Sequence, residues 1–373
     1  MAGKGKRPPE SRISRLQNSD AFAAITKQFG VSAITLASEK KVDRIPRLAS
    51  GVMPLDYALG GGWPIGRISL VYGHKSTGKS TLMTLAAGSE QRTCGVCYTQ
   101  LGPPDGTCQC GEFQDMSIVY IDVEGSYEGN WGKNLGCDPE RMLLSRPDYA
   151  EQALDILEAL IRSRECDLII LDSIAFLTPT KEIEESVAKD QVGAQARISG
   201  KAVRKFNSAM NAVGNQADGW KPTILLVNQI RMKVGLLFGN PETQPGGLAW
   251  GFAAANEVKV KGGKYEMDKE SGRPLYVDLD FRVDKNKTGV PKMEGNFRMM
   301  LSDTETKRKG QIADEGFILT QCERLGLLMG TGSSWTIANK KFKGKKYIEQ
   351  ELATNPEFDH EIRTMLMTVL LAA

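Results

Sequence analysis

Residues 73–80 of the chain are Gly73-His74-Lys75-Ser76-Thr77-Gly78-Lys79-Ser80. An apolar segment, Arg67–Tyr72, precedes them, and a helical pattern begins at Lys79. Glycines allow the backbone to curl so that several N–H groups point at phosphate oxygens, and the N-terminus of the helix adds partial positive charge. We therefore expect a phosphate-binding loop from Gly73 to Thr81. Lys79 would reach the β- and γ-phosphates of ATP, and Ser80 would offer its hydroxyl to Mg²⁺.

The segments around this loop alternate between buried strands and helices. Apolar runs at Ser117–Asp122, Asp167–Leu171 and Thr223–Asn228 are continuous, which is typical of strands covered on both faces. Tyr149–Ser163 carries apolar residues at helical spacing. The pattern predicts an α/β fold whose core is a mostly parallel, twisted sheet with helices on both faces. Further strands near 256–262, 275–283 and 297–301 would extend that sheet.

Three parts are expected along the chain. Residues 1–50 would form a basic arm followed by a helix, capped by Ser19 or Asp20 and ended by Gly30, and a strand at 31–36. Residues 51–301 would form the core. A change to polar, charged composition at 302–310 predicts a linker into a small α+β domain at 302–373.

Composition limits the class of protein only loosely. The net charge of the 373 residues is +3, so any nucleic-acid surface must come from local clustering of charge. No apolar run approaches the roughly 18 residues that cross a bilayer. The basic start of the chain, residues 1–10, has no apolar stretch behind it and does not resemble a secretory signal. We therefore expect a cytoplasmic protein with no membrane partner.

Two carboxylates follow strands at the edge of the sheet where ligands bind. Asp172 ends the run Leu168-Ile169-Ile170-Leu171, and beside a phosphate-binding loop it is expected to share Mg²⁺ with Ser80. Glu124 follows Ile121-Asp122-Val123. There it would orient and activate the attacking water, or, on the alternative interpretation, be a solvated loop acid.

Longer stretches in the same order around this loop resemble the RecA recombinase family. They are Leu171–Glu184, Asn228–Thr243 and Lys285-Asn286-Lys287, and the resemblance extends from about Ala24 to about Leu370. It implies a DNA-dependent ATPase that forms a helical filament on single-stranded DNA and carries out homologous pairing and strand exchange. On this resemblance, Glu124 is the catalytic glutamate and Gln229 senses the γ-phosphate. Lys285 and Lys287 would reach ATP bound by the adjacent protomer, so they too count as candidate catalytic residues.

The resemblance also implies two DNA-binding loops, at about Glu182–Arg197 and at Ile230–Gly247. Basic side chains would supply sequence-independent affinity for phosphates, and apolar ones would wedge between unstacked bases. The residues implied in contact with DNA are Val192, Arg197, Arg204, Arg231, Lys233, Val234, Phe238, Gly246 and Gly247.

Both ends of the chain acquire a role from the resemblance. The N-terminal helix and strand would dock on the neighbouring protomer, and the lysine-rich run 340–347 would help to gather duplex DNA, although such runs are often merely solvated surface. Four positions depart from the family pattern. Trp131 and Glu128 stand where the family has tyrosine and aspartate near the adenine. Gly251 and Glu257 stand where it has an interface lysine and an arginine.

An insertion at about 92–114 has no counterpart in the family. It contains Cys94, Cys97, Cys108 and Cys110, four soft ligands within a short stretch, which suit a closed tetrahedral Zn²⁺ site. The Cys-x-Cys half is less usual than Cys-x₂-Cys, so disulfides or reduced thiols remain alternatives. Three scattered cysteines, Cys137, Cys166 and Cys322, are expected to be buried small hydrophobes.

Two other functions fit a phosphate-binding loop on such a sheet. One is a ring-forming motor, such as a helicase or a branch-migration protein, and the other is a nucleotide-switched structural filament. Ring-forming motors usually carry their cysteines ahead of the core, whereas here the cysteines lie inside it. The second loop, with Phe238, favours the strand-exchange function over both.

Overall fold

The structure is a computed structural model of the chain. It describes residues 11–30, 33–34, 36, 45–95, 108, 110, 114–184, 193–216, 219–232, 239 and 241–372. The chain divides into two units, residues 1–45 and residues 46–373, and each is described by itself.

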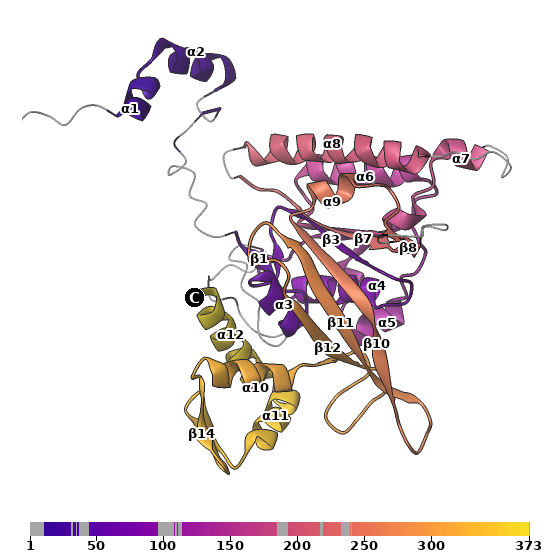
Figure 1. Cartoon of the computed structure of the whole chain (residues 1–373), viewed down its shortest axis with the longest axis vertical. Coiled ribbons are helices and arrows are strands. Elements are labelled where there is room, and N and C mark those ends of the chain that lie inside the picture. The colour runs from indigo at the N-terminus through magenta and orange to yellow at the C-terminus, as the bar shows by residue number, and fades with distance from the viewer. Residues whose placement is uncertain are drawn as a thin grey trace, which may run out of the picture. The chain divides into compact units, whose positions relative to one another are not determined.

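The first unit contains two short helices, α1 (Arg12–Gln17) and α2 (Asp20–Phe29) (Figure 1). The Ser19 hydroxyl caps α2 by accepting from the backbone N–H of Phe22 at 3.2 Å, and Gly30 ends the helix with φ +89°. Both boundaries agree with the sequence-based prediction. The strand predicted at 31–36 falls largely outside the described residues. The basic arm, residues 1–18, is predicted to be frayed; residues 1–10 lie outside the described residues, whereas the rest contains α1.

A nine-stranded sheet forms the centre of the second unit, in the order β13-β12-β11-β10-β3-β7-β6-β4-β5. The pairs from β10 to β5 are parallel, whereas β10 to β13 are joined by antiparallel pairs. The predicted α/β fold with a mostly parallel sheet is therefore confirmed. The strands are β3 (Ile68–Gly73), β4 (Ile118–Asp122), β5 (Leu143–Ser145), β6 (Leu168–Asp172), β7 (Thr223–Gln229), β10 (Asn256–Met267), β11 (Pro274–Asn286), β12 (Glu294–Met300) and β13 (Ile312–Ala313).

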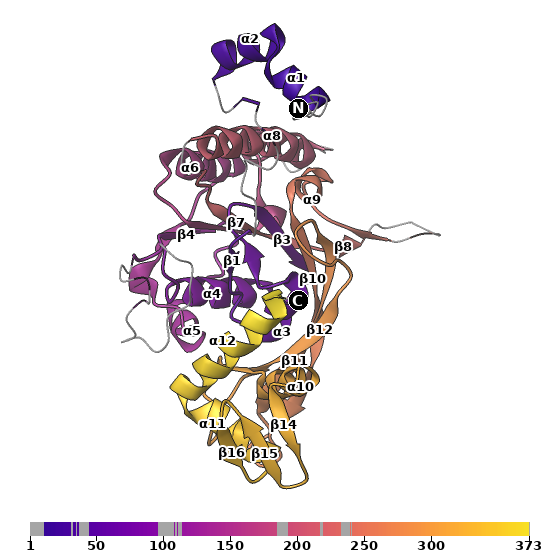
Figure 2. The same ribbon diagram turned by 90° about the vertical axis from the view of Figure 1, so that its left-hand side faces the viewer.

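Helices cover both faces of this sheet, as the continuous apolar strands predicted (Figure 2). Leu70 and Val71 point to opposite faces of β3, and both are fully buried. One face packs against α3 (Met53–Leu59), α4 (Lys79–Glu90) and α5 (Gly129–Asn134). The other packs against α6 (Ala150–Ser163), α8 (Ala194–Gly214) and α9 (Ala249–Ala253).

Short elements connect these layers. Two small antiparallel pairs join β1 (Arg47–Leu48) to β2 (Trp63–Pro64) and β8 (Arg231–Met232) to β9 (Glu242–Thr243). The first predicted DNA-binding loop contains helix at both ends, because α7 (Thr180–Glu184) reaches into it and α8 begins at Ala194. Two 3₁₀ turns complete the core, η1 (Pro139–Arg141) and η2 (Ile174–Phe176).

The C-terminal part has a hydrophobic cluster of its own, to which α3 contributes Met53. Its polar anchor is Asp314, which accepts two hydrogen bonds from the Arg363 guanidinium, at 2.9 and 2.5 Å, and one from the Met53 backbone. Its elements are α10 (Glu315–Arg324), β14 (Leu328–Thr331), β15 (Ser334–Ile337), β16 (Lys340–Phe342), α11 (Lys345–Thr354) and α12 (Pro356–Ala372). Among the described residues, no helix combines the length and the apolar character needed to cross a bilayer.

Candidate active site

The loop at 73–80 connects β3 to α4, the context that a phosphate-binding loop requires. A side chain at Gly73 would lie 2.2 Å from the Val260 carbonyl oxygen, so this position needs glycine. Lys79 begins the helix and is buried; its ammonium donates to the His74 carbonyl at 2.6 Å. Burial lowers the pKa of Lys79, against the attraction of Asp172 and Glu124. The lysine therefore lies within the field of both predicted carboxylates.

Asp172 ends β6 and is fully buried. Its Oδ2 accepts from the Tyr120 hydroxyl at 2.8 Å, while Oδ1 has no hydrogen-bond partner among the described residues. Burial raises the pKa of Asp172 to about 6, against hydrogen bonds from Ser80 and Tyr120 that lower it. A buried carboxylate oxygen without a partner, next to the hydroxyl of Ser80, suits a hard cation such as Mg²⁺.

Glu124 and Gln229 lie at the ends of different strands, β4 and β7, and the structure brings them together. The Gln229 Nε2 donates to Glu124 Oε2 at 3.1 Å, and the Ser173 hydroxyl approaches the same oxygen at 3.5 Å. The backbone N–H of Glu124 donates to the Asp172 carbonyl at 3.2 Å. Glu124 is thus held at the sheet edge by contacts with residues at the ends of β6 and β7.

Lys285 and Lys287 lie at the far end of β11, against α9 and β10. Lys285 Nζ donates to the Gly251 carbonyl at 2.5 Å and lies 3.6 Å from Glu257 Oε1. Lys287 Nζ donates to the Phe252 carbonyl at 3.3 Å. Two of the four departures from the family pattern, Gly251 and Glu257, are therefore direct contacts of Lys285. Burial and the neighbouring Lys287 lower the pKa of Lys285.

Glu128 has a structural task that the sequence comparison did not suggest. Its two carboxylate oxygens accept from the backbone N–H groups of Asn130 and Trp131 at 2.9 and 2.6 Å, which caps α5. These hydrogen bonds lower the pKa of Glu128. The Trp131 ring is half-buried, and Lys309 Nζ lies 5.5 Å from its centroid.

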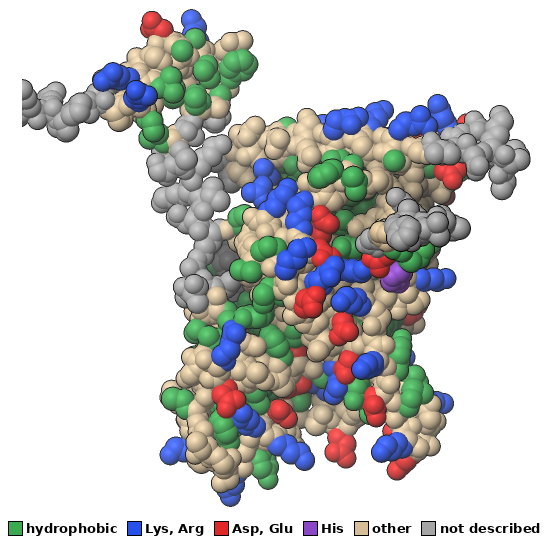
Figure 3. Space-filling view, viewed as in Figure 1, with side chains coloured by type: hydrophobic (Ala, Val, Ile, Leu, Met, Phe, Trp, Pro, Cys, Tyr) green, Lys and Arg blue, Asp and Glu red, His purple; other side chains and the backbone are tan. Residues whose placement is uncertain are grey.

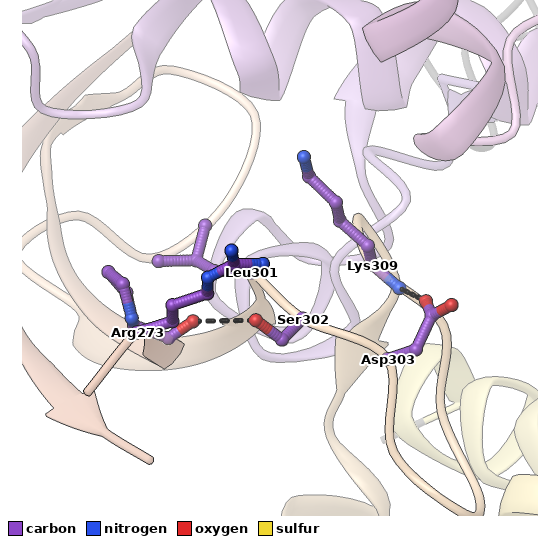
Figure 4. A pocket seen from close by; sticks show the side chains of 6 residues that line it. Arg273, Leu301, Ser302, Asp303 and Lys309 are labelled. Carbon is purple, nitrogen blue, oxygen red and sulfur yellow. Dashed lines mark hydrogen bonds between the residues drawn. The ribbon is translucent and has the colours of Figure 1, made fainter. Parts of the chain in front are cut away.

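A shallow pocket opens beside this tryptophan, and Figure 4 shows its lining. Its polar frame is two hydrogen bonds, from the Ser302 hydroxyl to the Pro274 carbonyl at 2.9 Å and from the Lys309 N–H to Asp303 at 2.8 Å. Lys309 belongs to the segment predicted as a linker, and no motif marks it. Sequence reasoning therefore missed this cation. The lining residues are Arg273, Pro274, Leu301, Ser302, Asp303 and Lys309.

The residues implied in DNA contact are only partly described. Arg197 and Arg204 are exposed on α8, and Figure 3 shows basic side chains gathered along that helix. Arg231 is exposed on β8. Gly246 and Gly247 have φ of +78° and +74°. Four residues, Val192, Lys233, Val234 and Phe238, lie outside the described residues.

Three of the four inserted cysteines lie together. The sulfur atoms of Cys94, Cys108 and Cys110 are all within 4.8 Å of one another; Cys94 is buried and Cys110 is exposed. The distance between the Cys108 and Cys110 sulfurs is 3.1 Å. Cys97 lies outside the described residues. This cluster can hold a thiophilic metal ion.

The remaining cysteines behave differently. Cys137, Cys166 and Cys322 are buried apart from one another, as predicted for small hydrophobes. Burial raises the pKa of each thiol, to about 11 for Cys137 and Cys322 and about 12 for Cys166. They are therefore poor thiolate ligands at neutral pH.

Comparison with known proteins gives the family. A family model described as the RecA N-terminal domain matches residues 17–100 and 108–305. Protein RecA of Campylobacter fetus is 33% identical over 345 residues, covering 92% of this chain and 91% of the relative. The chain belongs to the RecA family. Protein RecA of Wolinella succinogenes is 33% identical over 350 residues, 93% of this chain and 89% of that relative. The interruption of the RecA match, at 101–107, falls between Cys97 and Cys108 of the insertion.

Proposed function

We propose that the chain is a DNA-dependent ATPase that forms helical filaments on single-stranded DNA and catalyses homologous pairing and strand exchange. The observation that carries this proposal is the hydrogen bond from Gln229 to Glu124. This hydrogen bond links Glu124, a carboxylate suited to activating water, with Gln229. Gln229 directly precedes the second predicted DNA-binding segment, Ile230–Gly247.

ATP hydrolysis would use groups that the sheet edge already holds together. The N–H groups of the 73–80 loop and Lys79 bind the phosphates, and Ser80 and Asp172 hold Mg²⁺, which neutralises charge on the β- and γ-phosphates. Glu124 accepts the proton of the attacking water as the γ-phosphoryl group passes to that water, leaving ADP and phosphate. Trp131 stacks on the adenine, and Glu128 stabilises the turn that presents it.

Assembly would complete the site. Among the described residues, Lys285 and Lys287 contact α9 and Glu257 and do not contact the phosphate-binding loop of their own chain. We infer that they act on the nucleotide of the adjacent protomer and stabilise charge in the transition state. The exposed Ile13, Leu16 and Phe29 of α1 and α2 supply an apolar surface for docking on a neighbouring subunit.

DNA would bind to loops that emerge beside Gln229 and α8. Arg197, Arg204 and Arg231 are exposed cations suited to phosphates, and Val192, Lys233, Val234 and Phe238 are expected to join them. Gly246 and Gly247 would allow close backbone approach. The sequence of these loops contains no pattern of side chains suited to reading base edges, so we expect binding that does not depend on DNA sequence.

Duplex DNA would be gathered by the C-terminal lysines. Two of them face carboxylates, Lys340 lying 3.8 Å from Glu361 and Lys345 2.6 Å from Glu323. The exposed Lys341, Lys343 and Lys346 would therefore supply most of the attraction for DNA. The domain boundaries near 50 and 302 and the cytoplasmic location remain predictions.

The cysteine insertion would hold one structural Zn²⁺. Three sulfurs already lie within metal-binding distance of one another, and Cys97 would supply the fourth. The insertion is too short for an apolar core of its own, so a metal is the natural source of its stability.

Electron microscopy with single-stranded DNA tests the proposal against its competitors. With a non-hydrolysable ATP analogue we expect helical filaments along the DNA, and a strand-exchange assay on homologous duplex should give joint molecules. Closed rings would favour a motor, and filaments that never yield joint molecules would favour a structural role.

A further inference from the structure

Glu242 connects the phosphate-binding loop to the core through polar contacts with His74 and Lys259. Its Oε1 lies 3.3 Å from His74 Nε2, and its Oε2 accepts from Lys259 Nζ at 2.5 Å. The three residues belong to different elements: His74 to the loop after β3, Glu242 to β9 and Lys259 to β10. The side chains of His74 and Glu242 take no part in the proposed hydrolysis mechanism.

The contact between His74 and Glu242 matters because Glu242 belongs to the ribbon formed by β8 and β9. Its two strands lie within the second predicted DNA-binding segment, Ile230–Gly247, and pair through Arg231 with Thr243 and Met232 with Glu242. The β8 side is tied to the phosphate-binding loop by the Ile230 N–H, which donates to the Gly73 carbonyl at 2.9 Å. The β9 side is tied to the next residue, His74, by Glu242. Both strands of the ribbon are thus fixed to consecutive residues of one loop.

His74 also contacts the phosphate-binding lysine. Its carbonyl accepts from Lys79 Nζ at 2.6 Å and from the Thr77 hydroxyl at 3.0 Å. If Lys79 moves with the phosphates, its hydrogen bond to the His74 carbonyl would therefore shift His74. The imidazole of His74 would in turn shift Glu242. Gln229 reaches the site from β7 by a separate route, through Glu124.

Lys259 keeps the carboxylate ready for this contact. Its side chain is only 13% exposed and that of Glu242 27%, so the pair is partly shielded from water. The hydrogen bond from Lys259 and the nearby charges hold the pKa of Glu242 below its usual range. Glu242 therefore stays ionised and accepts from His74 over the neutral pH range.

We propose that Glu242 is a positioning residue that couples the phosphate-binding loop, through His74, to the β8–β9 ribbon and hence to DNA affinity. This inference rests on the proposed function. It adds a second link between nucleotide and DNA beside the one through Gln229.

The test measures a coupling factor in the full-length protein. This factor is the Kd for a dye-labelled oligo(dT) in ADP divided by the Kd in a non-hydrolysable ATP analogue, both by fluorescence anisotropy. Glu242→Gln keeps the shape of the side chain and should lower the factor by about 3-fold or more, as for a residue that carries coupling. Glu266→Gln makes the same change at an exposed position of β10 and should leave the factor at the wild-type value.

A double-mutant cycle decides whether His74 is the partner. His74→Gln should also lower the factor, and the double variant should lose no more than the larger single effect, because both changes remove one contact. If Glu242→Gln does not fold, Lys259→Met takes its place, with Lys261→Met as the control. Without the Lys259 ammonium the Glu242 carboxylate is no longer held in position, so the coupling factor should fall.

The outcomes separate the two proposals. The inference alone is overturned if the coupling factor of Glu242→Gln equals that of the wild type; Lys259→Met replaces this variant if it does not fold. The inference is also overturned if the two single effects multiply in the double variant. A wild-type factor near unity contradicts the proposed function itself.

Discussion

The side-chain amide of Gln229 donates a hydrogen bond of 3.1 Å to the carboxylate of Glu124. Gln229 is the last residue of β7, and Glu124 lies just past the end of β4, with β6 between the two strands. Any change in the chain after Gln229 can therefore alter the position of the proposed general base. On the proposed function, this hydrogen bond would join DNA binding to ATP hydrolysis.

Glu124→Gln should leave ATP and DNA binding close to wild type and slow hydrolysis by about 100-fold or more, because the amide cannot accept a proton from water. Steady-state phosphate release and nucleotide affinity check this. Glu140→Gln, at a surface position of η1, is the matched control. Hydrolysis at more than about half the wild-type rate in Glu124→Gln would exclude the general-base role.

Lys285→Ala or Lys287→Ala should preserve the folded monomer and remove most ATPase activity. Mixing either variant with Lys79→Ala protein should restore part of the turnover, since some interfaces then carry an intact lysine pair opposite an intact phosphate-binding loop. The ATPase rate is measured across mixing ratios, with co-assembly checked by light scattering. Co-assembly without any recovery would point to a site contained in one subunit.

Protein purified without chelator should contain about one zinc per chain by elemental analysis. Cys110→Ser should lower the zinc content, whereas Cys322→Ser, at a buried position outside the cluster, should not. ATPase activity should survive in both variants, because four thiolates would leave the metal no open coordination position for catalysis. Zinc near zero with all four thiols titratable would refute the site.

Asp56 should make the stability of the chain fall as the pH rises. Burial raises its pKa from 3.8 to about 7, so between these values the folded chain binds more protons than the unfolded chain. The contribution is fully favourable below the unfolded pKa and is lost as the pH rises through the folded pKa. Asp56→Asn should remove this dependence, worth at most about 4 kcal/mol between pH 4 and pH 8.

Denaturant unfolding at the two pH values measures the effect, with Asp155→Asn as an exposed control. The Ser50 N–H donates to Asp56 Oδ1 at 2.7 Å, and an asparagine carbonyl can accept it equally well. An unchanged pH dependence in Asp56→Asn would mean that the carboxyl is ionised in the folded chain.

Local patterns predicted the core well. Continuous apolar strands such as β6, and the helical spacing of α6, predicted the covered parallel sheet, and the loop at 73–80 was correctly placed between a strand and a helix. These features are encoded within short stretches, where periodicity and glycine positions carry the information. The position of Glu124 after a strand made it a candidate site residue. The resemblance of the chain to the RecA family gave it the predicted role of catalytic glutamate.

Contacts between distant segments could not be predicted in the same way. The contact of His74 with Glu242 depends on the register of β8 with β9, and that of Lys309 with Trp131 depends on the course of a polar segment without periodicity. The capping role of Glu128 required the position of a short helix. In each case the residue types were ordinary, and only the folded chain brought them together.

The rate of ATP hydrolysis with and without single-stranded DNA, in the wild type and in Gln229→Ala, tests the central claim most directly. Gln229→Ala removes the amide that contacts Glu124 while leaving the carboxylate in place. We expect DNA to stimulate the wild type by about 10-fold or more and to stimulate Gln229→Ala by less than about 2-fold, as for the loss of a coupling contact. Equal hydrolysis with and without DNA in the wild type, or full stimulation in Gln229→Ala, would contradict the account.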